Sequence, residues 1–459
     1  MGVIKLKVKI YNIILLLNFL FCMISLGIYY NAPVSYSYNY NLFVFVIFLF
    51  INFYFFYFNR SFEAGVGFEF LFFIGFMMGN FIYPIFYYPT NPYISVFQFP
   101  TNYSVINKST ALALVAYTFY MLFVSDFNKS IVNIKYRYTV SSKLVYTVTI
   151  ISFFLLVIFF YTGGISRLIN VYKGIVNLND VTNSSYVGLL FEVVTMLLAC
   201  LVFLTKSIKL RFFVIFYLIL VALILLSTGS RGFSISIFLI LMVGYSLLVK
   251  KIKGILLLVM LFLGAVSMYF LMILRELGID QVDNTNKALN RLRDSQNVFD
   301  PFLDLIVNNR NLYILVDFVD EYNSVYFVNA FTSLLNIVPG IGKLTDFFNI
   351  PDYLVSGNLP TYLHFGRNAD FGLGTNIVGE AYLSLGLLGV IVVFSLLGSL
   401  VKFLKFKNNL ILFIAYLMLA GQALFIIRSD YLFPLRKISW AIFLFFILTK
   451  IFPVKSHIK

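Results

Sequence analysis

Residues 211–249, RFFVIFYLILVALILLSTGSRGFSISIFLILMVGYSLLV, contain two apolar runs separated only by a short polar segment. The runs cover 211–227 and 232–249, close to the roughly 20 residues that a helix needs to cross the hydrocarbon layer of a membrane. Between them, small residues at 228–230 and Gly232 surround Arg231. The stretch therefore predicts two consecutive membrane-spanning helices with one isolated charge at the turn between them.

The whole chain has the composition of a membrane protein. Of its 459 residues, 61% are hydrophobic and only 12% are charged, whereas soluble domains carry roughly a quarter charged residues. Apolar runs recur along the sequence and predict an all-α polytopic membrane protein with about 12 transmembrane helices. The predicted spans are 10–30, 41–58, 66–88, 110–125, 144–161, 187–205, 211–227, 232–249, 254–274, 377–401, 408–427 and 433–452.

Positively charged residues orient this predicted bundle. Threading the spans alternately places both termini on one side, together with most of the 34 lysines and arginines. Lysine and arginine concentrate on the cytoplasmic side, so we expect both termini in the cytoplasm. The chain is then divided into transmembrane helices 1–9 in residues 1–274, a large, partly helical external loop in 275–376, and transmembrane helices 10–12 with a cytoplasmic tail in 377–459.

Several classes of function are excluded. The net charge of +15 lies at the ends of apolar runs and forms no basic patch with base-stacking aromatics, so no nucleic-acid partner is expected. Cys22 and Cys200 lie within apolar runs, and His364 is the one histidine outside the C-terminal tail, which leaves no set of zinc ligands. No glycine loop for a nucleotide is present either. We therefore expect no metal and no cofactor.

Two arginines lie at predicted external turns, where orientation of the spans does not require positive charge. Arg231 follows Ser230, and Arg428 precedes Asp430. An arginine at the end of a span can simply extend its guanidinium to the membrane interface, and Arg428 can pair with Asp430. Alternatively, a forked guanidinium beside the free N–H groups of a helix start suits a phosphate. The residues alone leave both interpretations open.

Residues 364–386, HFGRNADFGLGTNIVGEAYLSLG, gather polar side chains ahead of the span 377–401. His364, Arg367 and Asp370 precede the span, and Glu380 lies in its first turn. An ionisable group inside an apolar segment is a candidate for function, although Glu380 can also stabilise the helix dipole or pair with an arginine. His364 is either a catalytic or a surface histidine.

The external loop is expected to form short helices that cap the bundle. Asp300 and Pro301 are typical of a helix start, with the acid as N-cap and proline in the first turn. Residues 326–335 are apolar and are expected either to lie along the membrane surface or to pack on the spans.

The span layout, the segment 228–232, and the segment 372–376 followed by Glu380, Tyr382 and Gly386 resemble the Wzy-type O-antigen polymerases, also called oligosaccharide repeat unit polymerases. The resemblance implies a GT-C-like, metal-independent membrane glycosyltransferase of the bacterial inner membrane, active at the periplasmic face. Such enzymes transfer a growing glycan from its undecaprenyl diphosphate to the non-reducing end of a new lipid-linked repeat unit of O-antigen or capsule-like polysaccharide. The family usually has a chain-length regulator protein as a partner, in addition to the membrane lipids around it.

This resemblance assigns roles to the candidate residues, because a lipid diphosphate must be stabilised as it leaves and a sugar hydroxyl must lose its proton. The residues expected to bind the substrate diphosphates are Ser230, Arg231, Arg367 and Arg428. The residues expected to be catalytic are Glu380, His364 and Asp370, with Glu380 as the leading base. The alternatives are an O-antigen ligase, which uses the same donor, and a polysaccharide flippase or transporter, which would place charged residues deep in the spans.

Overall fold

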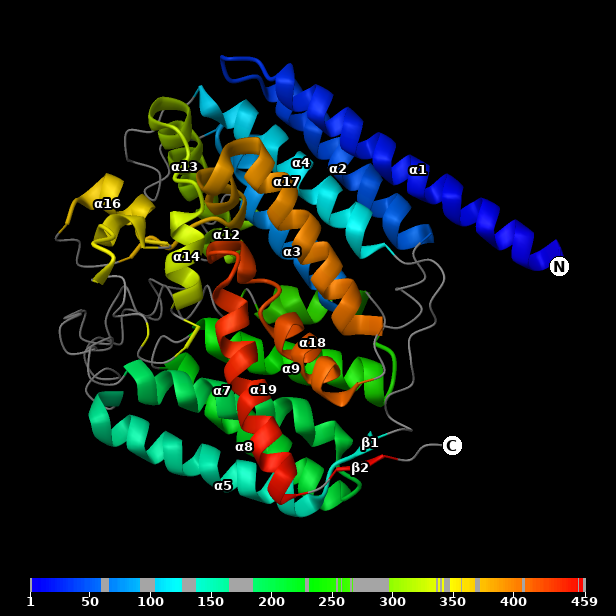
Figure 1. Ribbon diagram of the computed structural model, residues 1–459, viewed down its shortest axis with the longest axis vertical. Helices are drawn as coiled ribbons and strands as arrows, with labels where there is room; N and C mark the ends of the chain where they lie inside the picture. The colour runs from blue at the N-terminus through cyan, green and yellow to red at the C-terminus, as the bar shows by residue number, and fades with distance from the viewer. Residues whose placement is uncertain are drawn as a thin grey trace.

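The computed structural model describes residues 2–58, 66–90, 104–125, 138–164, 185–227, 231–252, 255–256, 258–264, 266, 297–335, 337–338, 341, 347–355, 357–367, 372–406, 409–452 and 454–456. These residues are almost entirely helical (Figure 1). The elements before the loop are α1 (Gly2–Tyr30), α2 (Tyr38–Phe58), α3 (Phe68–Asn80), η2 (Tyr83–Tyr87), α4 (Val105–Val124), β1 (Tyr138–Thr139), α5 (Ser142–Phe159), η5 (Phe160–Gly164), α7 (Ser185–Leu201), η7 (Val202–Leu204), α8 (Ile208–Ser227) and α9 (Arg231–Leu248). Those that follow are η8 (Asp300–Phe302), α12 (Leu303–Ile306), α13 (Asn308–Tyr322), α14 (Val328–Leu335), η10 (Asp352–Leu354), α16 (Leu359–Phe365), α17 (Ile377–Phe406), α18 (Leu410–Gly421), η11 (Ile426–Arg428), α19 (Phe433–Ile451) and β2 (Lys455–Ser456).

Among the described residues, seven helices are long and apolar enough to cross a membrane. These lie in α1, α2, α4, α5 with η5, α7 with η7, α8 and α17. The apolar helices α3, α9 and α18 are shorter, and α19 carries charged residues at both ends. The helical, polytopic class is thus confirmed, while the number of 12 spans stays a prediction because most of 254–274 lies outside the described residues.

Helix boundaries differ from the predicted spans where the chain contains an irregularity. The predicted span 66–88 is the helix α3 followed by the π-helical turn η2, which contains Pro84. The expected helix start at Asp300 is a 3-10 turn whose N-cap is Phe299, so Asp300 is not the cap. Its carboxylate instead accepts a hydrogen bond of 2.7 Å from the hydroxyl of Tyr87, which joins the loop to the spans.

The long helix α17 is broken near its N-terminal end. Gly386 has a φ of 59°, a left-handed conformation that glycine adopts without strain. The break leaves the carbonyls of Leu383 and Ser384 without their usual helical partners, and the N–H groups of Val325 and Phe327 donate to them at 2.8 and 3.0 Å. The 20 residues after the break span roughly 30 Å, enough to cross the membrane. The first two turns of α17 are therefore available to carry polar side chains.

Different parts of the chain lie at the two ends of the bundle. Both termini lie at one end (Figure 1), where β1 pairs with β2 and Val140 forms a bridge with Thr205. The links predicted to share one side of the membrane therefore meet in space. The loop helices α13, α14 and α16 lie at the opposite end (Figure 1). Which end faces the cytoplasm stays a prediction.

Burial is distributed as expected for helices in a membrane. In the apolar part of α4, 83% of residues are buried, because α1, α2 and α17 pack around it, whereas only 28% are buried in that of α8. A mostly apolar helix with so much exposed surface fits contact with lipid. Cys22 and Cys200 are both buried and free, in agreement with their interpretation as small hydrophobic residues.

A buried ion pair joins α3 to α17 at the end that holds the termini. The ammonium of Lys405 lies 2.5 Å from one carboxylate oxygen of Glu69, and both side chains are almost fully buried. The hydroxyl of Tyr416 on α18 donates to the other oxygen at 3.3 Å. The pair therefore fixes three helices to one another.

We expect Glu69→Gln to lower the free energy of unfolding by about 3–5 kcal/mol, because it leaves a buried ammonium without its counter-ion. The double variant Glu69→Gln/Lys405→Met should recover part of this loss. Thermal unfolding in detergent measures both effects, with Lys143→Met as the control because Lys143 is exposed. Unchanged stability of the single variant would contradict the structural role of the pair.

Candidate functional site

Two arginines and a histidine converge at the end of the bundle formed by the loop helices. Arg310 lies in the first turn of α13 and is 3% exposed. Burial and the positive charge of Arg428, the last residue of η11, lower the pKa of Arg310 to about 10. Burial and the charge of Arg310 in turn lower the pKa of His364, on α16, to about 4. At neutral pH the corner therefore holds two positive guanidinium groups and a neutral imidazole, an arrangement that an anion would stabilise.

Buried asparagines of α13 hold the arginine helix in place. The side-chain amide of Asn308 donates 2.8 Å to the carbonyl of Ile427, the residue before Arg428. That of Asn311 donates 3.1 Å to the carbonyl of Leu373. These bonds flank Arg310 and join α13 both to η11 and to the segment ahead of α17. The backbone of α13 around Arg310 is thus held next to η11 and to the segment before α17.

The segment 372–376 approaches the same corner closely. Gly374 has a φ of 72°, and a Cβ at this position would lie 3.3 Å from the carbonyl oxygen of Arg428. Asn376 then caps α17, because its side-chain oxygen accepts hydrogen bonds from the N–H groups of Val378 and Gly379 at 2.9 and 3.3 Å. The glycine is therefore needed both for its conformation and for the close approach of two backbones.

Glu380 lies in the first turn of α17 and is fully buried. One carboxylate oxygen accepts hydrogen bonds from the N–H of Gly357 at 3.0 Å and from the hydroxyl of Thr375 at 2.8 Å. The other accepts from the amide of Asn329 at 2.7 Å. Three loop segments are therefore held together by one carboxylate. We call this group of hydrogen bonds the Glu380 network.

The Glu380 network continues to the turn that follows Arg428. The hydroxyl of Ser384 donates 2.9 Å to the side-chain oxygen of Asn329 and lies 2.8 Å from the hydroxyl of Tyr431. Burial and the negative charges of Glu380 and Asp430 raise the pKa of Tyr431. The carboxylates of Glu380 and Asp430 are thus close enough to the phenol of Tyr431 to affect its ionisation. The phenol stays neutral at physiological pH.

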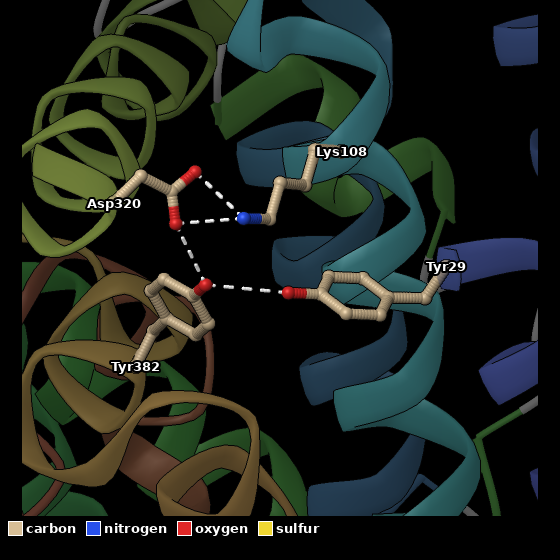
Figure 2. Close-up of polar contacts among 4 residues, drawn as sticks. All are labelled: Tyr29, Lys108, Asp320 and Tyr382. Carbon is tan, nitrogen blue, oxygen red and sulfur yellow. Dashed lines mark hydrogen bonds and ion pairs between the residues drawn. The ribbon is translucent and has the colours of Figure 1, made fainter. Parts of the chain in front are cut away.

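The far end of α13 is fixed by a second group of contacts, which we call the Lys108 clamp. Figure 2 shows the ammonium of Lys108 between the two carboxylate oxygens of Asp320, each 2.6 Å away. Tyr382 donates 2.9 Å to the same carboxylate, and its hydroxyl lies 3.2 Å from that of Tyr29. Lys108 is in the first turn of α4 and Asp320 in the last turn of α13, where helix dipoles disfavour these charges. Their mutual contact offsets this cost and joins α13 to α1, α4 and α17.

The structure brings some of the predicted site residues together. His364 and Arg428 lie near Arg310, and we call these three residues the arginine corner. Glu380 lies in the Glu380 network, which reaches the turn after Arg428. Arg367 follows α16 and is exposed. Arg231 is the first residue of α9, but its side chain is outside the described part. Ser230 and Asp370 also lie outside the described residues.

Sequence reasoning missed Arg310. The available signal was an arginine enclosed by asparagines at 308, 309 and 311 and followed by the apolar run 312–316. Four consecutive polar residues that are all buried need partners within the protein. The pattern alone did not indicate that those partners would lie beside Arg428.

Among the described residues, no group of three or more His, Cys, Asp or Glu side chains could hold a metal ion. Comparison with known proteins identifies one family: a model described as O-antigen polysaccharide polymerase Wzy matches residues 10–459. No curated protein and no solved structure matches the chain.

We expect Asp320→Asn to weaken the Lys108 clamp and to lower the free energy of unfolding by about 0.5–1 kcal/mol, because a third of each charged side chain is exposed and solvent screens the pair. In a double-mutant cycle with Tyr382→Phe, the two losses should not add, since Asp320→Asn removes the charge of the acceptor and Tyr382→Phe the donor of the same hydrogen bond. Glu321→Gln, one residue along on α13, is the control. Additive effects on thermal unfolding would show that the clamp does not act as a unit.

Proposed function

Since the chain belongs to the O-antigen polysaccharide polymerase Wzy family, which polymerises lipid-linked repeat units, we propose that Arg310, Arg428 and His364 form the site where the substrate diphosphate binds. The observation that carries this proposal is the hydrogen bond from Asn308 to the carbonyl of Ile427, which joins the start of α13 to the residue before Arg428. The positive charge of Arg428 accordingly lowers the pKa of Arg310. Guanidinium groups bind phosphate oxygens through paired hydrogen bonds. A buried site strengthens that attraction because water screens it less.

The reaction that we propose is a glycosyl transfer between two undecaprenyl-diphosphate-linked glycans. The acceptor hydroxyl at the non-reducing end of a new repeat unit attacks the anomeric carbon of the growing glycan. The bond from that carbon to the diphosphate oxygen breaks, and the lipid diphosphate leaves with the electron pair. Arg310 and Arg428 stabilise the negative charge that develops on the leaving group, the role that a metal ion has in metal-dependent transferases.

We assign the acceptor proton to His364 and a positioning role to Glu380. His364 is neutral in the free site, and a bound diphosphate would raise its pKa and make it a stronger base. The two carboxylate oxygens of Glu380 already accept three hydrogen bonds and are fully buried. The base role of Glu380, and that of Asp370, stay predictions.

An apolar groove lined by residues that precede Arg310 and Arg428 in the chain supports a lipid-linked substrate. Its volume is about 330 Å³, and its wall includes Leu424 and Leu305, a few residues before Arg428 and Arg310 respectively. Its rim includes Leu223 and Phe238, whose side chains are 61% and 42% exposed on helices predicted to face lipid. We propose that a polyprenyl chain enters here from the membrane.

The residues around this groove extend the proposed site. The groove is lined by the end of α8 and the start of α9, which flank the segment 227–231. We therefore assign Arg231 and Ser230 to a diphosphate at the mouth of the groove. Arg367, exposed three residues after His364, is assigned to the rim of the arginine corner.

From the distribution of lysine and arginine we propose that both termini lie in the cytoplasm. The family likeness supports a site at the periplasmic face of the bacterial inner membrane, a GT-C-like arrangement of the spans and a chain-length regulator as partner. An O-antigen ligase is the second candidate, because it uses the same donor. A deletion strain that makes lipopolysaccharide with a single repeat unit supports the polymerase. A strain that lacks O-antigen on its core while lipid-linked polymer accumulates would instead indicate the ligase.

We expect Arg310→Ala and Arg428→Ala each to reduce polymer formation by roughly 10²–10³-fold, because each removes cationic stabilisation of the leaving group. Arg→Lys variants should be partly impaired, since lysine supplies charge without the paired hydrogen bonds. Polymer length on gels, at matched protein levels, measures the effect. Lys209→Ala, exposed on α8 near the opposite end, is the control, and normal polymer from both arginine variants would refute the site.

We expect inorganic pyrophosphate, as a mimic of the lipid diphosphate, to bind more tightly as the pH falls toward 4. The free His364 titrates at about 4, and a bound anion raises that pKa, so binding is accompanied by proton uptake below the bound pKa. Titration calorimetry of the purified protein between pH 7 and 5 measures this dependence. His364→Gln should flatten its histidine-dependent part, and an identical slope in that variant would contradict the placement of His364.

A further inference from the structure

The helix α14 is amphipathic with its polar side turned inward. Asn329, Thr332 and Ser333 lie on one face and are buried. Phe331 and Leu334 lie on the other and are 41% and 51% exposed. The polar face is used by the Glu380 network, through Asn329. The exposed apolar face is opposite to what water favours on the outer surface of a protein.

The exposed face of α14 belongs to a larger apolar patch. Val338 is 48% exposed, and Phe347 and Phe348 are 77% and 50% exposed. The ring of Phe348 lies against that of Phe331, with 5.5 Å between centroids. We call these residues together with Leu334 the α14 patch.

Contacts with α19 set the level of the α14 patch along the bundle. The indole N–H of Trp440 donates 2.6 Å to the carbonyl of Ile337, next to Val338. Trp440 is seven residues into α19, roughly 10 Å from its outer end. Lys437, one turn before Trp440, lies 2.7 Å from Glu192 of α7, and Glu192 is itself well inside the span Tyr186–Leu204.

From these contacts we propose that the α14 patch lies in the bilayer, at the boundary between headgroups and acyl chains of the outer leaflet, with α14 as an interfacial helix. Its apolar face contacts lipid, and its polar face supports the Glu380 network. A patch one to two turns below the outer end of a span is at the depth where interfacial helices bury their apolar side. Tryptophan beside it also fits this boundary.

Lipid is the occupant that these observations favour over a partner protein. The exposed side of α19 below Trp440 is equally apolar, with Phe443 69% exposed, so the α14 patch continues a surface that already faces acyl chains. This position of α14 places the Glu380 network at the level of the lipid headgroups. If the proposed function holds, the diphosphate of a lipid-linked substrate lies at the same level.

The test measures whether the exposed face of α14 contacts lipid or water. A full-length chain with Cys22→Ala and Cys200→Ala receives one cysteine, either Leu334→Cys or Val338→Cys, and is spin-labelled and reconstituted in phosphatidylcholine liposomes. Collision rates of the nitroxide with oxygen, which partitions into lipid, and with a water-soluble nickel chelate are compared. Phe443→Cys on α19 is the lipid control, and Tyr322→Cys, 63% exposed at the charged end of α13, is the water control.

We expect both α14 labels to collide more often with oxygen than with nickel, as the label at 443 should, and the label at 322 to show the reverse order. A nickel preference at 334 and 338 would overturn the proposal, and so would exclusion of both reagents, which indicates cover by protein. Trp440, the single tryptophan of the chain, reports docking, since a nitroxide at 338 should quench its fluorescence. A lipid-exposed label that leaves Trp440 unquenched would contradict the proposed level.

Discussion

The proposed site depends on keeping two guanidinium groups near each other, the buried one of Arg310 and the half-buried one of Arg428. Burial of one cation near another is unfavourable, as the lowered pKa of Arg310 reflects. Arg310 donates 3.4 Å to the side-chain oxygen of the neighbouring Asn311, and contacts near both ends of α13 hold the helix in place. The asparagines near Arg310 fix one end, and the Lys108 clamp fixes the other. These contacts offset the unfavourable repulsion between the two guanidinium groups, and a bound anion would reduce that repulsion.

The break in α17 makes the remainder of the site possible. A continuous helix would satisfy its own carbonyls and offer the loop no backbone partners. Because the helix is interrupted at Gly386, the chain after α13 is held by hydrogen bonds to Leu383 and Ser384. The same short helical segment presents Glu380 on one side and Tyr382 on another, toward the Glu380 network and the Lys108 clamp. One helix of two turns therefore couples both anchors of the site.

The sequence predicted the features that follow from local composition. The apolar runs predicted the apolar helices. The glycine- and asparagine-rich stretch before Glu380 predicted polar side chains at the start of the span 377–401. Arg310 was missed because its meaning depends on Arg428, which is distant in the chain and comes close only through the packing of η11 on α13. The hydrogen bonds of Glu380 were missed for the same reason, since Asn329, Gly357 and Thr375 come from three separate segments. Local pattern predicts which residues are unusual, whereas their roles depend on tertiary contacts.

Two groups of buried charges in the bundle differ in whether their members have opposite or equal sign. At the end near the termini, Glu69 and Lys405 are opposite charges within hydrogen-bonding distance, so each satisfies the other and no ligand is required. At the loop end, Arg310 and Arg428 have the same sign, and the field of one lowers the proton affinity of the other. A bound anion would offset this repulsion, which is the physical basis for proposing that the substrate diphosphate binds near the two arginines.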